Sequence, residues 1–102
     1  MSSARGNQIQ VKAAAEADIE EAWAWYARTA PELGDAWLQA LDLAFAQIQR
    51  NPYAWQVVYK DAHRALVRKF PYAIIYRIRP ERVVVLAVAH ASRDPRRWKS
   101  RL

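Results

Sequence analysis

The most informative part of the chain is residues 72–90, which read YAIIYRIR-PE-RVVVLAVAH. The first eight residues alternate in character, which indicates a strand, because successive strand side chains point to opposite faces. One face collects the aromatic and branched side chains, which we expect to pack beneath helices: Tyr72, Ile74, Tyr76 and Ile78. After a tight turn at Pro80-Glu81, the more apolar run Arg82–His90 is expected to be the most central strand. A turn this short joins antiparallel neighbours, so the sequence predicts a β-hairpin.

Shorter strands are predicted before this hairpin. Residues 63–70 alternate and end at Pro71, with one face formed by Arg64, Leu66, Arg68 and Phe70. A brief strand is expected at Gln56–Tyr59 and another near the start of the chain, at Ile9–Lys12.

Two helices are predicted between the first strand and the rest. From Ala13 onward, apolar side chains recur every three or four residues, which is the spacing of one helix face. Pro31 closes this helix, because proline disfavours helical backbone at the preceding residue. Gly34-Asp35 is expected to open the second helix and Asn51-Pro52 to end it. The spacing assigns three aromatic residues to the core: Trp23, Trp37 and Phe45.

These elements predict an α+β fold of two layers. It has an N-terminal strand, an antiparallel helical hairpin packed on a mostly antiparallel sheet of three to four strands, and a short C-terminal helix or tail. The 102 residues suit a single domain, since domains commonly have about 100–150 residues. We expect residues 1–8 to be a flexible lead-in and residues 9–102 to form the domain.

The net charge of +6 is distributed unevenly. Residues 1–50 carry four Arg or Lys and seven Asp or Glu, whereas residues 51–102 carry twelve and three. The helical layer is therefore mildly acidic, and the sheet and tail are strongly basic. Three acids cannot neutralise twelve bases, so we expect the uncovered sheet face to bind a polyanionic partner.

Several kinds of chemistry are excluded or disfavoured. The chain has no cysteine, which excludes disulfides and cysteine nucleophiles and fits a reducing cytoplasm. Its histidines, His63 and His90, stand 27 positions apart, so no metal site is expected. The two glycines, Gly6 and Gly34, cannot form a phosphate-binding loop. No apolar run approaches the ~20 residues of a membrane span, and no secretory signal is evident. We expect neither a cofactor nor a membrane partner.

Two motifs stand in the basic half. One is R-x-x-x-R-x-F-P-Y at residues 64–72, followed by Tyr76, and the other is H-x-x-R-x-P-x-x-W at residues 90–98. Together with the two preceding helices, their order and spacing make the chain, from Val11 to Arg101, resemble the RelE/ParE superfamily of type II toxin–antitoxin toxins. The fold that this resemblance implies agrees with the one predicted above.

The resemblance implies one of two activities. RelE-like members cut messenger RNA on the ribosome without a metal ion, and ParE-like members are described as poisoning DNA gyrase. Ala73 stands where RelE-type nucleases usually carry an arginine. Trp98 lies near the position of their late tyrosine or histidine, and it cannot exchange a proton at neutral pH. The closing W-x-x-R at residues 98–101 is ParE-like, so the interpretation favours ParE and a non-enzymatic role.

Candidate site residues follow for each activity. Metal-free RNA cleavage needs a proton acceptor and cations for the phosphate. In a nuclease these would be Arg64, Arg68, Tyr76, His90 and Arg93, of which the resemblance matches Arg64 and Arg93 to basic positions. We expect His90 to be a structural histidine at the end of a strand, hydrogen-bonded to the backbone or to Asp94, more readily than a general base. An exposed tryptophan indicates an interface, so the surface for a target or antitoxin is expected to comprise Trp25, Arg64, Arg68, Arg93, Arg96, Arg97, Trp98 and Arg101.

The predicted function is the toxin of a type II toxin–antitoxin module of the plasmid-stabilising, growth-arresting kind. It would inhibit DNA gyrase in the cytoplasm and be neutralised by a cognate antitoxin in a hetero-oligomer, with an acidic, largely disordered antitoxin segment wrapping the toxin. Two alternatives stay open: a RelE-like endoribonuclease acting on the ribosome and its mRNA, and a non-toxic basic module that binds nucleic acid or protein.

Overall fold

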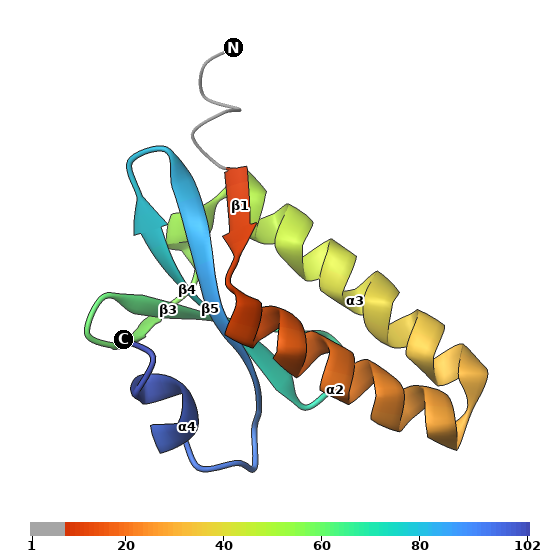
Figure 1. Cartoon of the computed structure of the whole chain (residues 1–102). Helices are drawn as coiled ribbons and strands as arrows, with labels where there is room; N and C mark the ends of the chain where they lie inside the picture. Colours follow the sequence, from red (N-terminus) through yellow and green to blue (C-terminus); the bar gives the residue numbers. More distant parts are fainter. Residues whose placement is uncertain (1–7) are drawn as a thin grey trace.

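A computed structural model describes residues 8–102, in which two long helices lie against a five-stranded sheet (Figure 1). In chain order the elements are β1 (Gln8–Val11), α2 (Ala13–Thr29), α3 (Pro31–Arg50), the 3-10 turn η1 (Pro52–Ala54), β2 (Val57–Tyr59), β3 (Ala62–Leu66), β4 (Tyr72–Arg79), β5 (Arg82–His90) and α4 (Arg96–Lys99). The predicted α+β fold is confirmed. Residues 1–7 of the expected lead-in lie outside the described residues, and Gln8 already belongs to β1. None of the helices in this part of the chain has the length and apolar character that crossing a membrane requires.

The strands are ordered β1-β5-β4-β3-β2. Neighbours pair antiparallel, except that β1 runs parallel to β5 with Val11 opposite Val85. The sheet has five strands rather than three or four, because β1 joins the same sheet as the four later strands. β4 occupies the middle and β5 lies beside it, so β5 is an inner strand but not the central one.

The helical hairpin turns within a single residue. Ala30 has an extended backbone between α2 and Pro31. Pro31 occupies the first position of α3, where its missing N–H costs nothing and its fixed φ suits the helix. α3 therefore begins before the expected start at Gly34-Asp35. Gly34 instead marks a close approach of the helices, because a Cβ there would stand 3.0 Å from Trp23 Nε1.

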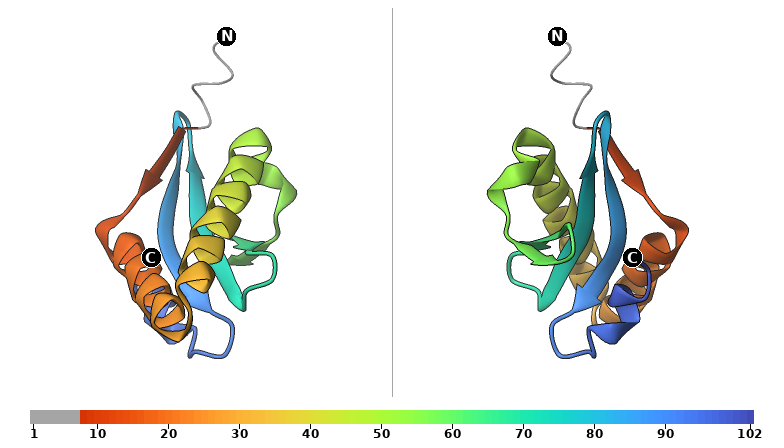
Figure 2. Two further views of the ribbon diagram at one scale, coloured as in Figure 1. Left: turned by 90° about the vertical axis from the view of Figure 1, so that its right-hand side faces the viewer. Right: turned by 90° about the vertical axis from the view of Figure 1, so that its left-hand side faces the viewer.

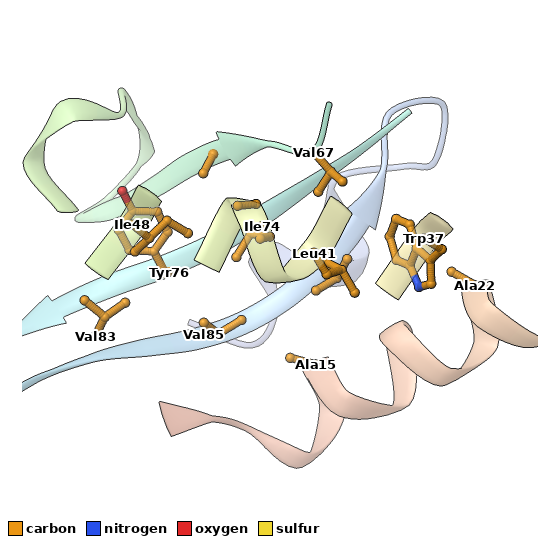
Figure 3. Packing of buried hydrophobic residues seen from close by; sticks show 13 residues of the cluster. Ala15, Ala22, Trp37, Leu41, Ile48, Val67, Ile74, Tyr76, Val83 and Val85 are labelled. Carbon is orange, nitrogen blue, oxygen red and sulfur yellow. The ribbon is translucent and has the colours of Figure 1, made fainter. Parts of the chain in front are cut away.

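The main core lies between the helical hairpin and one face of the sheet (Figure 3). Trp37 and Tyr76 are its largest fully buried side chains. The Trp37 indole N–H donates a 3.2 Å hydrogen bond to the Ile19 carbonyl oxygen, which ties α3 to α2. The prediction that Trp37 is buried is confirmed, but the prediction that Trp23 is buried is wrong. Trp23 is 42% exposed, because it packs over Gly34 at the start of α3, outside the main core.

β3 ends earlier than predicted. Leu66 is its last residue, and a turn through Lys69, whose φ is +70°, leads to β4. The left-handed backbone at Lys69 breaks the alternation, so Phe70 packs against the main core. Arg68 lies in this turn. The prediction that Arg64, Arg68 and Phe70 share one strand face is wrong for this reason.

The α4 segment, residues 94–102, packs on the other face of the sheet, which we call the outer face. A small second cluster forms there between Trp98, Leu102 and three sheet residues, Ala62, Ile75 and Ala87. Figure 2 shows α4 lying beside α2. Helices on one face and the α4 segment on the other explain why β5 is apolar throughout most of its length.

Candidate functional site

β1 covers only half of β5. It pairs with residues 82–85, and the chain then enters α2, so within residues 8–102 no strand lies beside Leu86–His90 on that side. A groove of about 590 Å³ lies at this open half of β5, and we call it the β5 groove. Its walls come from α2, the second half of β5, the start of β4 and the α4 segment.

The path of the chain places α2 along this open edge. Lys12 N–H donates a 3.0 Å hydrogen bond to the Val85 carbonyl oxygen just before the helix begins. From Lys12 to Asp18 a helix rises about 9 Å, and from Val85 to Val88 a strand spans about 10 Å. Asp18 therefore arrives level with Val88, and its Oδ2 accepts a 3.0 Å hydrogen bond from Val88 N–H. The carboxylate takes the place of the missing strand.

A β-bulge exposes a further backbone group of β5. The pairing of β4 with β5 shifts by one residue at Leu86. The Leu86 carbonyl oxygen accepts a 3.0 Å hydrogen bond from Arg101 Nη1. The same guanidinium donates to both carboxylate oxygens of Asp18, at 2.7 and 3.3 Å. Both side chains are mostly buried, with 24% of Arg101 and 16% of Asp18 exposed.

Aromatic and basic side chains line the β5 groove. Trp25 is 58% exposed, and its ring meets Tyr26 edge to face with centroids 5.2 Å apart. Arg97 and Trp98 come from α4, and Arg93 comes from the loop before it. Among residues 8–102, no acidic side chain forms an ion pair with Arg93 or Arg97. Both guanidiniums are therefore available to an anionic partner.

His90 and Tyr72 lie opposite each other on β5 and β4 and also line the groove. Their rings meet edge to face with centroids 4.9 Å apart. Ser92 N–H donates a 3.0 Å hydrogen bond to His90 Nδ1, as expected for a strand-end histidine, and Ser92 Oγ lies 2.8 Å from the same nitrogen. Since the Nδ1 lone pair already accepts the Ser92 N–H, it does not point at a substrate in the groove as a general base would. Burial raises the pKa of Tyr72, which keeps the phenol neutral.

The structure does not bring the nuclease candidates together. Tyr76 is fully buried in the main core, and burial raises its pKa to about 12. Arg64 is exposed on β3, and Arg68 is exposed in the following turn. Of this set only His90 and Arg93 line the β5 groove. Among the described residues, no group of three acidic or histidine side chains could hold a metal ion.

The residues predicted to bind a partner lie closer together than the nuclease candidates do. Five of the eight line the β5 groove: Trp25, Arg93, Arg97, Trp98 and Arg101. Arg64 and Arg68 do not line it. Arg96 does not line it either, and its guanidinium forms a 2.6 Å ion pair with Asp94.

Sequence reasoning identified Trp25 but missed the charged residues that share its helix face. Asp18, Glu21 and Arg28 line the groove from α2 together with Trp25. They recur every three or four residues, so they share one helix face. That spacing could have linked these charged residues to Trp25. Charged residues on one helix face usually face solvent, however, and the sequence does not show that the end of β5 lies beside them.

Comparison with known proteins identifies the family. A family model described as "ParE toxin of type II toxin-antitoxin system, parDE" matches residues 9–95. The chain belongs to this family of ParE toxins. Toxin ParE2 of Mycobacterium tuberculosis, found in two strains, is 29% identical over 89 residues, covering 86% of this chain and 85% of the relative.

A solved structure carries the same fold as this ParE-family toxin. The chromosomal ParDE TA system from P. aeruginosa matches with a TM-score of 0.77 at 13% identity, covering 86% of this chain and 99% of the matched chain. The range that matches the family model contains α2, β4 and β5 but ends inside the α4 segment. Arg97, Trp98 and Arg101 therefore belong to the part of the groove that this match does not reach.

Proposed function

We propose that a cognate antitoxin neutralises this ParE-family toxin by laying an acidic segment in the β5 groove, forming a hetero-oligomer in the cytoplasm. The observation that carries this proposal is the exposed Trp25 in one groove with Arg93 and Arg97, neither of which has an acidic partner among the described residues. Similarity to a chain of a ParDE TA system supports a protein partner of this kind.

Protein interfaces obtain most of their binding energy from a few residues. Tryptophan and arginine are the residue types enriched at binding hot spots, where they are surrounded by contacts that exclude water. Trp25 supplies a large apolar surface, and Arg93 and Arg97 supply charge that an acidic segment would complement. An antitoxin segment that folds on binding can cover such an elongated, mixed surface.

The experiment compares two tryptophans of the same helix. Trp25→Ala should weaken antitoxin binding by about 30-fold or more, as expected for a hot-spot residue. Trp23→Ala is the matched control, because Trp23 is also exposed, at 42%, but does not line the groove. Calorimetric titration with the antitoxin measures both affinities, after thermal melts have shown that both variants fold. Equal weakening by both variants would place the antitoxin elsewhere.

We further propose that the free toxin inhibits DNA gyrase, as the ParE-like resemblance implies. The buried state of Tyr76 and the hydrogen bonds on His90 Nδ1 support this target over messenger RNA, because RNA cleavage without a metal needs a free proton acceptor. Trp98 of α4 cannot serve as that acceptor.

Two assays on the purified protein test the target. Gyrase supercoiling should fall as toxin is added, while ribosome-bound messenger RNA stays intact. Codon-positioned cuts in the RNA with unaffected supercoiling would establish the RelE-like alternative instead. If neither changes and induction of the gene does not slow growth, the protein is a non-toxic binding module.

A further inference from the structure

The α4 segment crosses the outer face of the sheet and is held at two places. On the β2 side, Trp98 meets Tyr59 edge to face with centroids 6.1 Å apart, and Lys99 Nζ lies 4.7 Å from the centre of the Tyr59 ring. On the α2 side, Arg101 reaches Asp18 and the Leu86 carbonyl oxygen. Between these places, Trp98 and Leu102 rest on the small cluster of the outer face.

The contacts at Tyr59 and those at Asp18 differ in how strictly they fix the position of the α4 segment. The edge-to-face and cation–π contacts at Tyr59 tolerate sliding of the rings, since their energy varies gradually with offset. The contacts of Arg101 are directional, because a planar guanidinium meets a carboxylate and a carbonyl oxygen with three hydrogen bonds. Asp18 is itself fixed, since its Oδ2 also accepts the Val88 N–H. The bonds at Asp18 therefore set where the α4 segment lies along the sheet.

Arg101 belongs to the same short segment as two other groove residues, Arg97 and Trp98. Arg97 and Trp98 stand four and three residues before Arg101 in a segment whose backbone is tied by short-range hydrogen bonds, including Arg101 N–H to the Trp98 carbonyl oxygen at 2.9 Å. Both residues line the groove only through this segment. We propose that Asp18 is a positioning residue: by holding Arg101, it docks the α4 segment so that Arg97 and Trp98 form one wall of the β5 groove. The consequence for antitoxin affinity rests on the function proposed above, whereas the docking itself does not.

Hydrogen exchange of the α4 segment tests the docking. Asp18→Asn keeps an oxygen that can accept the Val88 N–H but removes the charge that holds Arg101. Backbone amides of residues 97–102 should then exchange about tenfold faster, as expected when a local unit opens more readily. Amides of the β4–β5 hairpin should be unchanged. Glu20→Gln is the matched control, because it removes the same charge from α2 at an exposed position outside the groove. If Asp18→Asn and Glu20→Gln exchange alike in the α4 segment, the inference is overturned.

A spectroscopic measurement separates docking from a general loss of stability. Bonding of the Arg101 guanidinium to two acceptors hinders its rotation, so its Nη groups should give separate NMR signals in the wild-type toxin and averaged signals in Asp18→Asn. The double variant Asp18→Asn/Arg101→Gln should exchange no faster in the α4 segment than either single variant. Additive effects of the two substitutions would show that the residues act separately and would overturn the inference.

Binding to the antitoxin completes the test. Asp18→Asn should lower affinity several-fold relative to Glu20→Gln, in step with the faster exchange. Faster exchange with equal affinities would overturn the role of Asp18 in shaping the groove. If the wild-type toxin binds no antitoxin at all, the proposed function fails, and the exchange data still decide whether Asp18 docks the α4 segment.

Discussion

The Tyr76 hydroxyl donates a 2.6 Å hydrogen bond to the Pro52 carbonyl oxygen, which joins the middle strand of the sheet to the turn after α3. The Tyr76 ring also stacks on His63, with centroids 5.2 Å apart and planes inclined by 13°. His63 Nδ1 in turn donates a 2.7 Å hydrogen bond to the Trp55 carbonyl oxygen. These contacts fix the chain between α3 and β2, so we assign Tyr76 to stability and not to chemistry on a target.

Replacing Tyr76 with Phe should destabilise the toxin. The substitution keeps the ring and leaves the carbonyl oxygen of the buried Pro52 without its partner. We expect the free energy of unfolding to fall by about 1–3 kcal/mol, measured by urea denaturation at neutral pH. Tyr72→Phe is the control, because Tyr72 lines the groove and is only partly buried. If both variants lose the same free energy of unfolding, the hydrogen bond to Pro52 contributes nothing to stability.

Tyr76 should also set part of the alkaline stability. Burial raises its pKa from the ordinary 10.0 to about 12, so the folded state keeps a proton that the unfolded state loses. The resulting stabilisation is complete below about pH 10 and is lost as the pH rises towards 12. Chemical denaturation across this range should show stability falling more steeply in the wild-type toxin than in Tyr76→Phe. If the stability of the wild type and that of Tyr76→Phe fall in parallel with pH, the alkaline loss of stability does not come from Tyr76.

Gly34 should resist replacement by alanine. An alanine at an open helix position usually stabilises by roughly 0.5–1 kcal/mol. Here the new Cβ would stand 3.1 Å from the Ala27 Cβ and 3.4 Å from its Cα, and a helix backbone cannot move aside as a side chain can. We expect Gly34→Ala to destabilise by about 1 kcal/mol, as overpacking does. In an Ala27→Gly background, Gly34→Ala should destabilise the protein less. A double-mutant cycle based on urea denaturation measures this difference. A stabilising Gly34→Ala in the wild-type background would show that the helices can separate freely.

The fold could be predicted wherever one periodicity runs without interruption. β4 and both long helices belong to this class, since their side-chain spacing assigns most of each buried face. Trp23 is the exception, because it packs over Gly34 outside the main core. Two further errors occur where a single backbone position changes the geometry. Lys69 adopts a left-handed φ that turns Phe70 into the core, and Pro31 can begin a helix as well as end the one before it. Neither effect is visible in hydrophobic periodicity.

The candidate site could be predicted only in part. Exposed aromatic and basic residues such as Trp25 and Arg97 were identified because their types are typical of interfaces. Asp18 could not be, because its partner Arg101 stands 83 residues away. Their contact depends on how far β1 extends and on the bulge at Leu86, and both are properties of the assembled sheet.

Asp61 should make a small contribution to stability that disappears in acid. Arg77 Nε donates to Asp61 Oδ1 at 2.7 Å and Arg79 Nη1 lies 3.3 Å from Oδ2, and the hydrogen bond from Arg77 above all holds the pKa of Asp61 below its ordinary 3.8. A lowered folded pKa stabilises above the ordinary value, and this stabilisation is lost as the pH falls through the folded value.

The comparison of wild-type toxin with Asp61→Asn tests this contribution. The wild type should melt slightly higher at pH 6, because an exposed pair contributes little to stability, and the difference should close as the pH falls below 3.8 and through the lowered pKa of Asp61. Thermal melts across this range measure it. A difference that stays constant with pH would show that the carboxylate charge is not responsible.

The arginines of the β5 groove should attract the antitoxin more strongly than arginines elsewhere on the sheet. Arg93→Ala/Arg97→Ala and Arg64→Ala/Arg68→Ala each remove two positive charges, the first pair from the β5 groove and the second from outside it. Because the change in net charge is the same, any difference between them reports local attraction and not overall charge. We expect the groove pair to slow association about tenfold at low salt and the other pair to slow it much less. The difference should narrow in high salt, where screening is strong, and surface plasmon resonance at several salt concentrations measures it. If the pair outside the groove slows association equally, the antitoxin approaches through the general field of the basic sheet, and the β5 groove has no special part in its capture.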